Sequence, residues 1–222
     1  MKIGIDPEDV EGVEGVEGIE NIGTACPDLY VSIGTGNRKI GLIPSWSLPQ
    51  GETCNQRLLK YCSNICYANK IKRLFPNVWD MWQHNLWMLK NHPVLTEMLI
   101  QKYLYTALPQ VMRLHVAGDF YSKDYLAMWK RIAENTSGTV FYGYSKMDGI
   151  DHATLPPNLR ILRSQWPGMP APRQRNVRRN CWVQDGTEKR IPKNAIQCCG
   201  DCPKCGFKCA FADLDVVIQL HR

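Results

Sequence analysis

The sequence predicts an α/β fold, either a partial (βα) barrel or an open parallel sheet, with a cysteine-rich C-terminal appendage. Two observations lead to this class. Residues 111–144 read as strand, tight turn, helix and strand, and strands that alternate with helices usually pair in parallel. The chain also has ten cysteines, and six of them lie between Cys181 and Cys209.

Composition divides the chain into three parts. Residues 1–29 are an acidic leader that repeats Val-Glu-Gly, and such glycines and like charges predict a mobile tail or a weak strand. Residues 30–165 are the α/β core and carry the first cysteine group. Residues 166–222 begin with a connection rich in Pro and Arg and continue as a cysteine-rich metal-binding segment.

The core elements follow from hydrophobic periodicity. Residues 39–43 alternate like a strand, and residues 67–91, apart from Pro76, have apolar side chains at helical spacing. A second helix is expected from about Pro93 to Leu108, because proline suits a first helical turn.

The clearest βαβ unit comes next in the chain. Residues 111–116 and 139–144 read as strands around an amphipathic helix at 124–134, and residues 159–163 read as a further strand. Ligands bind at the carboxyl ends of parallel strands. The expected functional edge therefore contains Gly118, Asp119, Tyr144, Ser145, Lys146, Ser164 and Gln165.

Hydrophobic runs, cysteine content and net charge indicate the cellular compartment and the class of partner. No apolar run approaches the ~20 residues that span a bilayer, and the N-terminus lacks the apolar core of a signal peptide. We therefore expect a cytoplasmic protein with no membrane partner. In a reducing compartment, cysteines indicate metal ligands before disulfides. The net charge of +6 fits an anionic or nucleic-acid partner, and equally a solvated basic surface.

The cysteines fall into two candidate metal sites. Cys54, Cys62 and Cys66 have the spacing C-x7-C-x3-C, and no fourth cysteine follows until Cys181. Three thiolates favour an iron–sulfur cluster with one iron left open. The second group contains Cys181, Cys202, Cys205 and Cys209, with either Cys198 or Cys199 as a further candidate. Four thiolates suit zinc as well as a cluster, and reduced core cysteines are the remaining alternative.

Several motifs resemble the phage "gene product 88" family. They are Ile43-Pro44-Ser45-Trp46-Ser47-Leu48-Pro49, Cys62-x3-Cys66-Tyr67-Ala68, His115-Val116-Ala117-Gly118-Asp119-Phe120-Tyr121-Ser122, Phe141-Tyr142-Gly143-Tyr144-Ser145-Lys146 and Cys202-x2-Cys205-Gly206. The resemblance covers roughly residues 30–212. It implies a phage or mobile-element origin and little about chemistry.

A looser resemblance is to the radical S-adenosylmethionine superfamily, in which three cysteines after the first strand hold a [4Fe–4S] cluster. The resemblance implies that Cys54, Cys62 and Cys66 are the cluster ligands. It also implies that Gly118 and Asp119 form the turn that holds the cofactor amine. The cysteine spacing and the position of the aromatic residue depart from the superfamily pattern. The cofactor-binding candidates are Tyr67, His115, Gly118, Asp119, Tyr144 and Ser145.

Two functions follow as hypotheses. The first is a radical S-adenosylmethionine-like iron–sulfur enzyme that contains one or two [4Fe–4S] clusters and acts on an unknown substrate, with a nucleic acid or nucleotide as the guess. The second is a non-catalytic nucleic-acid-binding protein of phage replication or regulation, stabilised by zinc or a cluster. The sequence assigns no catalytic residue under either hypothesis.

Overall fold

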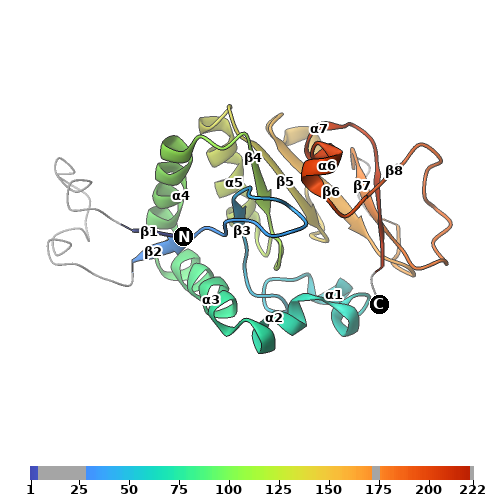
Figure 1. Cartoon of the computed structure of the whole chain (residues 1–222), viewed down its shortest axis with the longest axis horizontal. Coiled ribbons are helices and arrows are strands. Elements are labelled where there is room, and N and C mark those ends of the chain that lie inside the picture. The colour runs from blue at the N-terminus through green and yellow to red at the C-terminus, as the bar shows by residue number, and fades with distance from the viewer. Residues whose placement is uncertain (5–28, 172–175, 221–222) are drawn as a thin grey trace, which may run out of the picture.

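The computed structural model describes residues 1–4, 29–171 and 176–220. Its centre is a seven-stranded sheet with the order β3-β4-β5-β6-β7-β9-β8 (Figure 1). All neighbouring pairs in this sheet are parallel. The strands are β3 (Ser45–Trp46), β4 (Val111–Leu114), β5 (Val140–Ser145), β6 (Leu159–Gln165), β7 (Asn180–Gln184), β8 (Ile196–Gln197) and β9 (Val216–Gln219). The expected α/β class with a parallel sheet is confirmed.

Three long helices cover one face of the sheet. They are α3 (Pro76–Asn91), α4 (Pro93–Ala107) and α5 (Lys123–Asn135). Pro76 and Pro93 stand in the first turns of α3 and α4, and the hydroxyl of Ser122 accepts a hydrogen bond from the Tyr125 amide at the start of α5. Their apolar sides form the main core with alternate residues of β4, β5 and β6, such as Met112, Phe141 and Ile161.

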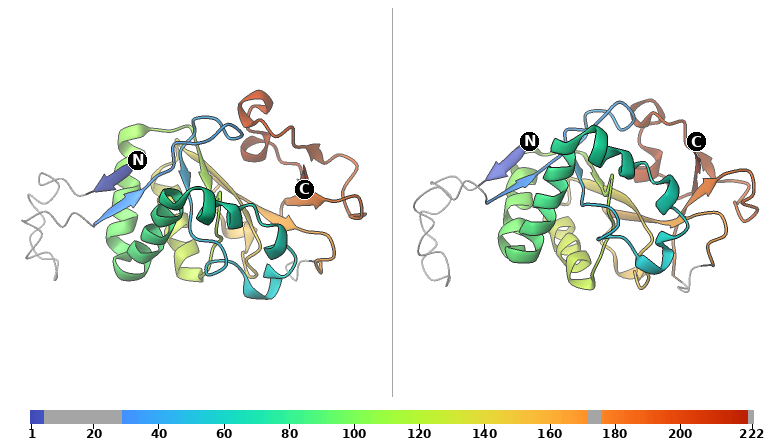
Figure 2. Two further views of the ribbon diagram at one scale, coloured as in Figure 1. Left: turned by 60° about the horizontal axis from the view of Figure 1, so that its bottom comes forward. Right: turned by 90° about the horizontal axis from the view of Figure 1, so that it is seen from below.

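The opposite face of the sheet carries a second, smaller core. Tyr142, Leu162 and Val216 project there from β5, β6 and β9, and pack against Cys209 and Ala210. The last two belong to α7 (Lys208–Phe211), which follows the short helix α6 (Cys202–Cys205). Figure 2 shows α6 and α7 on the side of the sheet away from α3 and α4. We call this covered side the inner face of the sheet.

The C-terminal segment is integral to the sheet. Strands β7, β8 and β9 all come from residues 166–222, and they extend the same ladder that begins at β3. The segment shares the smaller core with the preceding residues, because Cys181, Cys209, Ala210 and Val216 pack there with Tyr142 and Leu162. The described part of the N-terminal leader contains strand β1 (Lys2–Gly4), which pairs antiparallel with β2 (Tyr30–Ser32); the Val-Glu-Gly repeat lies outside the described residues.

Short elements connect β3 to α3. They are α1 (Gln56–Leu59), the 3₁₀ turn η2 (Ser63–Ile65) and α2 (Ala68–Leu74); a second 3₁₀ turn, η3 (His152–Thr154), follows β5. The strand expected at residues 39–43 is wrong. The side chain of Asn37 accepts hydrogen bonds from the amides of Lys39 and Ile40, and this local turn replaces the extended conformation.

None of the helices in the described ranges combines the length and apolar character that crossing a bilayer demands.

Candidate functional site

The carboxyl ends of β3, β4, β5 and β6 meet along one edge of the sheet because the strands are parallel neighbours. The segment after β3 carries the first cysteine group, and the turn after β4 carries Gly118 and Asp119. Ser145 ends β5 and is followed by Lys146. This edge is where ligands bind in open α/β sheets.

The first cysteine group lies in the short elements after β3. Cys62 is buried, and Cys54 and Cys66 are partly buried. The pKa of Cys54 is raised to about 11, chiefly by burial; the Gly51 amide opposes this shift, and the nearby Asp119 carboxylate adds to it. Burial also raises the pKa of Cys62, and the adjacent Lys146 ammonium opposes that shift. Cys66 lies close enough to Cys62 to raise its pKa, so the three thiols and Lys146 share one neighbourhood.

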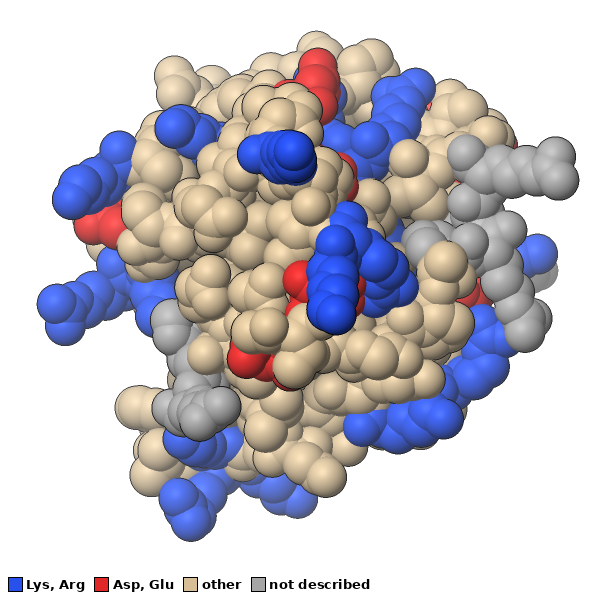
Figure 3. All heavy atoms as spheres, turned by 90° about the vertical axis from the view of Figure 1, so that its right-hand side faces the viewer, with Lys and Arg blue, Asp and Glu red and all other residues tan. Residues whose placement is uncertain are grey.

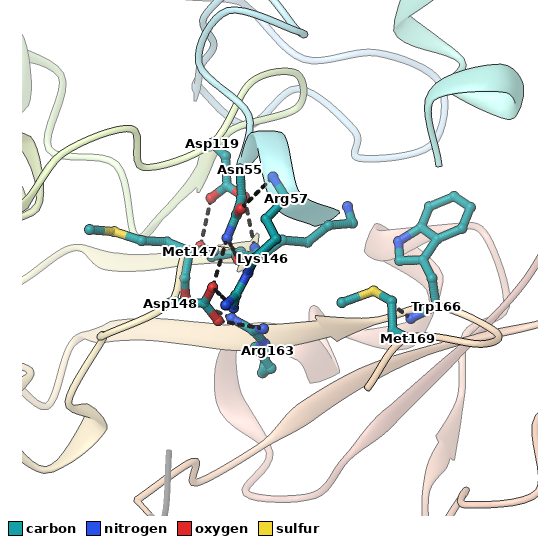
Figure 4. Close-up of polar contacts among 10 residues, drawn as sticks. Asn55, Arg57, Asp119, Lys146, Met147, Asp148, Arg163, Trp166 and Met169 are labelled. Carbon is teal, nitrogen blue, oxygen red and sulfur yellow. Dashed lines mark hydrogen bonds and ion pairs between the residues drawn. The ribbon is translucent and has the colours of Figure 1, made fainter. Parts of the chain in front are cut away.

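Polar contacts fasten the cysteine loop to the end of β5 (Figure 4). The side-chain amide of Asn55 donates to the backbone carbonyl of Lys146 at 2.8 Å and to the carboxylate of Asp148 at 3.1 Å. Arg57 forms an ion pair with the same carboxylate, and buried Arg163 of β6 approaches it at 3.2 Å. We call Asn55, Arg57, Asp148 and Arg163 the loop clasp. It holds Cys54 above the end of β5.

Asp119 joins the ends of β4 and β5. Its carboxylate is buried and accepts hydrogen bonds from the Ser145 hydroxyl at 2.6 Å, the Lys146 amide at 2.7 Å and the Phe120 amide at 2.7 Å. Burial raises the pKa of Asp119, and these hydrogen bonds oppose that shift. A carboxylate offers about four acceptor positions. The contacts therefore make Asp119 and Ser145 a fastening of the edge, with little acceptor capacity left for a ligand.

Gly118 lets the cysteine loop approach the turn after β4. Its φ is +80°, and a Cβ there would stand 2.7 Å from the Thr53 hydroxyl and 2.8 Å from the Leu48 carbonyl oxygen. The Leu48 amide also donates to the Ala117 carbonyl at 3.1 Å. Only glycine combines this φ with such a close approach.

His115 belongs to the helix-covered side. Its Nε2 lies 2.9 Å from the Tyr125 hydroxyl of α5, which also accepts from the Trp46 indole. The ring packs edge-on against Phe120, and its Nδ1 has no hydrogen-bond partner among the described residues. Burial, with the Arg113 charge second, lowers the pKa of His115 to about 3. The side chain therefore stays neutral and packs as a core residue.

Lys146 and Trp166 stand together at the inner face. The Lys146 ammonium lies 5.1 Å from the centre of the Trp166 ring, and the Trp166 indole donates to Ser164 at 3.1 Å. Gln165 follows Ser164 and is fully buried, with no partner for either side-chain amide atom among the described residues. An aromatic face beside a cation suits a ligand that joins a flat ring to an anionic group.

Tyr67 and Tyr144 both lie near Arg113. The ring of Tyr144 is 4.0 Å from the Arg113 guanidinium carbon, and its hydroxyl donates to the Cys209 thiol at 3.0 Å. Tyr67 is half exposed as a whole residue, but burial of its hydroxyl raises its pKa; Arg113 opposes this shift, and Cys66 and Cys54 add to it. The two tyrosines therefore reach from Arg113 toward different cysteine groups.

The second cysteine group lies on the inner face. Cys181 and Cys209 are buried in the smaller core, and Cys202 and Cys205 are partly buried. The pKa of Cys202 is raised to about 11, chiefly by burial and also by Cys209, Cys205 and Cys198, against a hydrogen bond from Tyr142 that lowers it. The four predicted ligands therefore come together, although they lie on β7, α6 and α7.

A metal centre would require both groups to contract. Within residues 1–4, 29–171 and 176–220, no three His, Cys, Asp or Glu side chains are arranged so that they could hold a metal ion. The thiols are neighbours without surrounding one point. Thiolate is nevertheless the ligand that zinc and iron–sulfur clusters select, so the donor set fits either group while its arrangement would have to tighten.

Sequence reasoning missed the loop clasp and Arg113. Asn55 and Arg57 lie 91 to 93 residues from Asp148 in the chain, and no local pattern signals such a contact. Arg113 could have been noticed, because a charged residue stands in the otherwise apolar strand Val111-Met112-Arg113-Leu114. A charge in a buried strand requires a partner or a function.

Comparisons with known proteins give phage relatives. A family model described as "Gene product 88" matches residues 31–210. The "Gene 88 protein" of Mycobacterium phage D29 is 28% identical over 123 residues, which cover 50% of this chain and 51% of the relative. The "Gene 88 protein" of Mycobacterium phage L5 is 27% identical over 123 residues, with the same coverage. The chain thus spans about half the length of the curated relatives it matches. No solved structure matches, and none of these matches belongs to the radical S-adenosylmethionine superfamily.

Proposed function

We propose that this chain, which belongs to the gene product 88 family, is an iron–sulfur protein whose cluster is bound by Cys54, Cys62 and Cys66. The observation that carries the proposal is the gathering of three thiols and Lys146 at the carboxyl edge of a parallel sheet. The strands β3, β4, β5 and β6 are neighbours in chain order, and the cysteines follow the first of them.

The residues around the thiols have separate tasks in this proposal. The loop clasp fixes Cys54 over the end of β5, and Gly118 admits the loop to the edge. Cys54, whose pKa burial raises to about 11, is protonated at neutral pH, so binding must release protons from the thiols. A cluster with three thiolates supplies one iron with an open coordination position.

We propose S-adenosylmethionine as the cofactor that meets this open position. Lys146 presents an ammonium beside Cys62, and Trp166 presents a ring beside that ammonium. The pair could bind the carboxylate and the adenine of such a molecule by charge and stacking. The reaction would then be radical chemistry on a nucleotide or nucleic-acid substrate, a class supported here by the basic net charge alone.

Anaerobic purification tests the cluster. The wild-type chain should contain iron and acid-labile sulfide and absorb broadly near ~400 nm. Cys62→Ala should remove the iron held by the first group, whereas Cys199→Ala, which changes an exposed cysteine, should retain the wild-type content. Colourless protein with zinc alone, or equal iron in Cys62→Ala and wild type, would refute the proposal.

A second experiment tests the cofactor separately. The reduced, iron-loaded chain is incubated with dithionite and S-adenosylmethionine, and the release of 5′-deoxyadenosine is measured. Lys146→Met should bind S-adenosylmethionine at least ~10-fold more weakly, equivalent to about 1.4 kcal/mol, while it retains its iron. If the iron-loaded protein releases no 5′-deoxyadenosine, the proposal of a cluster stands and the proposal of S-adenosylmethionine as cofactor is refuted.

A basic cavity favours the alternative of nucleic-acid binding without catalysis. It has a volume of about 250 Å³ and is lined by Arg160, Arg178 and Arg179. These residues lie at or before the starts of β6 and β7, so the cavity is at the amino edge of the sheet, away from the thiols. On the face seen in Figure 3, Lys and Arg are dispersed among neutral residues. DNA binding that weakens with salt and survives Cys62→Ala would support this alternative.

A further inference from the structure

We propose that Cys198, and not Cys199, is a ligand of a metal–thiolate centre on the inner face, and that the buried guanidinium of Arg113 balances the charge of this centre. The interior thiol group consists of Cys181, Cys198, Cys202, Cys205 and Cys209. The proposal does not depend on the first cysteine group or its cofactor.

Strand register places Cys198 on the same face of the sheet as Cys181, with β9 between their strands. Cys181 of β7 is the partner of Val216 in β9, and Val216 is also the partner of Ile196 in β8. Cys198 lies two residues beyond Ile196, and its amide continues the ladder by donating to the Val217 carbonyl at 2.8 Å. Residues two apart in a strand share a face. Cys198 therefore faces the same side as Ile196, Val216 and Cys181.

Cys199 has the opposite environment. Alternation along the strand directs it away from the inner face, and it is exposed, whereas Cys198 packs against the smaller core. Its thiol lies 3.1 Å from the Asp201 carbonyl, within its own turn. Cys198 is also close enough to Cys181, Cys202 and Cys209 to raise the pKa of each.

The surroundings of the Arg113 guanidinium indicate that an anion binds beside it. Its side chain lies on the inner face of β4 and is only 8% exposed. Its Nη1 has no hydrogen-bond partner among the described residues, and its Nη2 reaches the His115 carbonyl only at 3.5 Å. The rings of Tyr142 and Tyr144, at 5.0 and 4.0 Å from the guanidinium carbon, are its closest charge-stabilising neighbours. A buried cation without a paired anion is strongly destabilising.

The interior thiol group can supply that anion. Tyr144 joins Arg113 to this group, since its ring lies 4.0 Å from the guanidinium carbon and its hydroxyl donates to the Cys209 thiol at 3.0 Å. The Arg113 charge accordingly opposes the burial-driven rise in the pKa of Cys181 and Cys209. Four thiolates around zinc or a cluster retain net negative charge, because the sulfurs outweigh the metal. Metal binding would draw the thiols together and give Arg113 its counter-charge in one step. Zinc and iron fill the same role here.

Differential alkylation tests the ligand assignment on the intact chain. Anaerobically purified protein is treated with iodoacetamide before and after metal removal by a chelator, and each cysteine is read by mass spectrometry. Cys199 should react equally in both states, whereas Cys198 should react at least ~10-fold faster after metal removal. Equal protection of the two cysteines, or none for Cys198, would overturn the assignment.

Matched variants test the same point by metal content. Cys198→Ser should lose the metal of the interior group, while Cys199→Ser should retain it. Metal analysis with acid-labile sulfide separates zinc from iron–sulfur. Cys62→Ser reports on the first group alone: retained interior metal in Cys62→Ser, with no metal at the first group of wild type, would sink the proposed function and leave this inference intact. Full metal content in Cys198→Ser would contradict it.

Charge balance by Arg113 has its own readout. Arg113→Met should transfer its interior metal to a competing chelator at least ~10-fold faster than wild type, and Arg113→Lys should restore part of the retention because it keeps the charge. Unchanged transfer rates in Arg113→Met would refute the charge-balancing role.

Discussion

The backbone of Leu48 lies directly against Gly118: a Cβ built on Gly118 would stand 2.8 Å from the Leu48 carbonyl oxygen. Gly118→Ala should therefore displace the cysteine loop. We expect a loss of ~2–4 kcal/mol in the free energy of unfolding, because a positive φ and a backbone clash combine. Chemical denaturation measures the loss, and metal content should fall with it.

Gly51→Ala is the control for this prediction. Gly51 also has a positive φ, +84°, but a Cβ there would meet no atom within 4 Å. We expect only the backbone penalty of ~1–2 kcal/mol. If the two variants were equally destabilised, the close approach of Leu48 to Gly118 would contribute nothing.

Asp148→Asn should loosen the cysteine loop. The change removes the carboxylate that Arg57 and Arg163 share and leaves the buried Arg163 charge without its partner. Because Asp148 is 35% exposed on its side chain, solvent screening limits the loss to ~1–2 kcal/mol. Faster alkylation of Cys54 in the metal-free protein is the direct measurement. An unchanged Cys54 rate would mean that the clasp does not position the loop.

The same variant should change the pH dependence of stability. Burial raises the pKa of Asp148, but Asn55, Arg163 and Arg57 outweigh it, so the net shift is downward. A lowered folded-state pKa stabilises the protein above the unfolded value of ~3.9, and this stabilisation is lost as the pH falls through the folded value. The difference in melting temperature between wild type and Asp148→Asn should shrink below about pH 4.

His115→Asn should reduce the acid sensitivity of the fold. Burial lowers the pKa of His115 to about 3, whereas an unfolded histidine binds a proton near pH ~6.5. As the pH is lowered from ~6.5 to about 3, protonation of His115 in the unfolded state should therefore reduce the free energy of unfolding of the wild type by up to ~1.4 kcal/mol per pH unit. Asparagine tolerates the positive φ of 55° at this position, so the variant should fold.

His152 provides the matched comparison for this pH effect. It is buried, and its pKa is also lowered, first by burial and then by Arg178 and Arg163. His115→Asn and His152→Asn should each reduce the slope of the free energy of unfolding against pH below pH ~6.5. The double variant should reduce this slope more than either single variant. A wild-type slope in His115→Asn between pH 6 and about 4 would contradict the neutral, buried state of His115.

Tyr144→Phe tests the proposed interior metal centre and should weaken it. Its hydroxyl donates to the Cys209 thiol at 3.0 Å, and a hydrogen bond to a ligating sulfur tunes the metal site. We expect a ~10-fold faster release of interior metal to a chelator, with little change in overall stability. Tyr142→Phe is the control, since its hydroxyl lies 4.0 Å from the Cys202 thiol and should matter less. Equal release from wild type and Tyr144→Phe would exclude a role for this contact.

Local sequence predicted the long helices and three of the seven strands of the central sheet, β4, β5 and β6. The strands at Val111–Leu114 and Val140–Ser145 and the helix at Lys123–Asn135 follow from periodicity, since each buries one side of a regular element. The expected strand at residues 39–43 failed because a single side chain, Asn37, bonds to the following amides. Alternation of apolar residues cannot reveal such a competing bond.

The positions of several candidate site residues were predictable, and their contacts were not. Parallel strands placed Gly118, Asp119 and Ser145 at one edge, as expected. Asp119 and Ser145, however, bond to one another, and His115 packs toward α5. Which way a side chain turns at a strand end depends on neighbours that come from other strands.

Taken alone, the amino-acid order established an α/β chain with parallel strands and two groups of thiols, because hydrophobic period and cysteine spacing are local properties. Folding decided which thiols meet. Cys198 and Cys199 are chemically identical neighbours in the chain, yet β8 directs the first inward and the second to solvent. That difference arises from pairing with β9, a contact across the sheet that spacing along the chain does not encode.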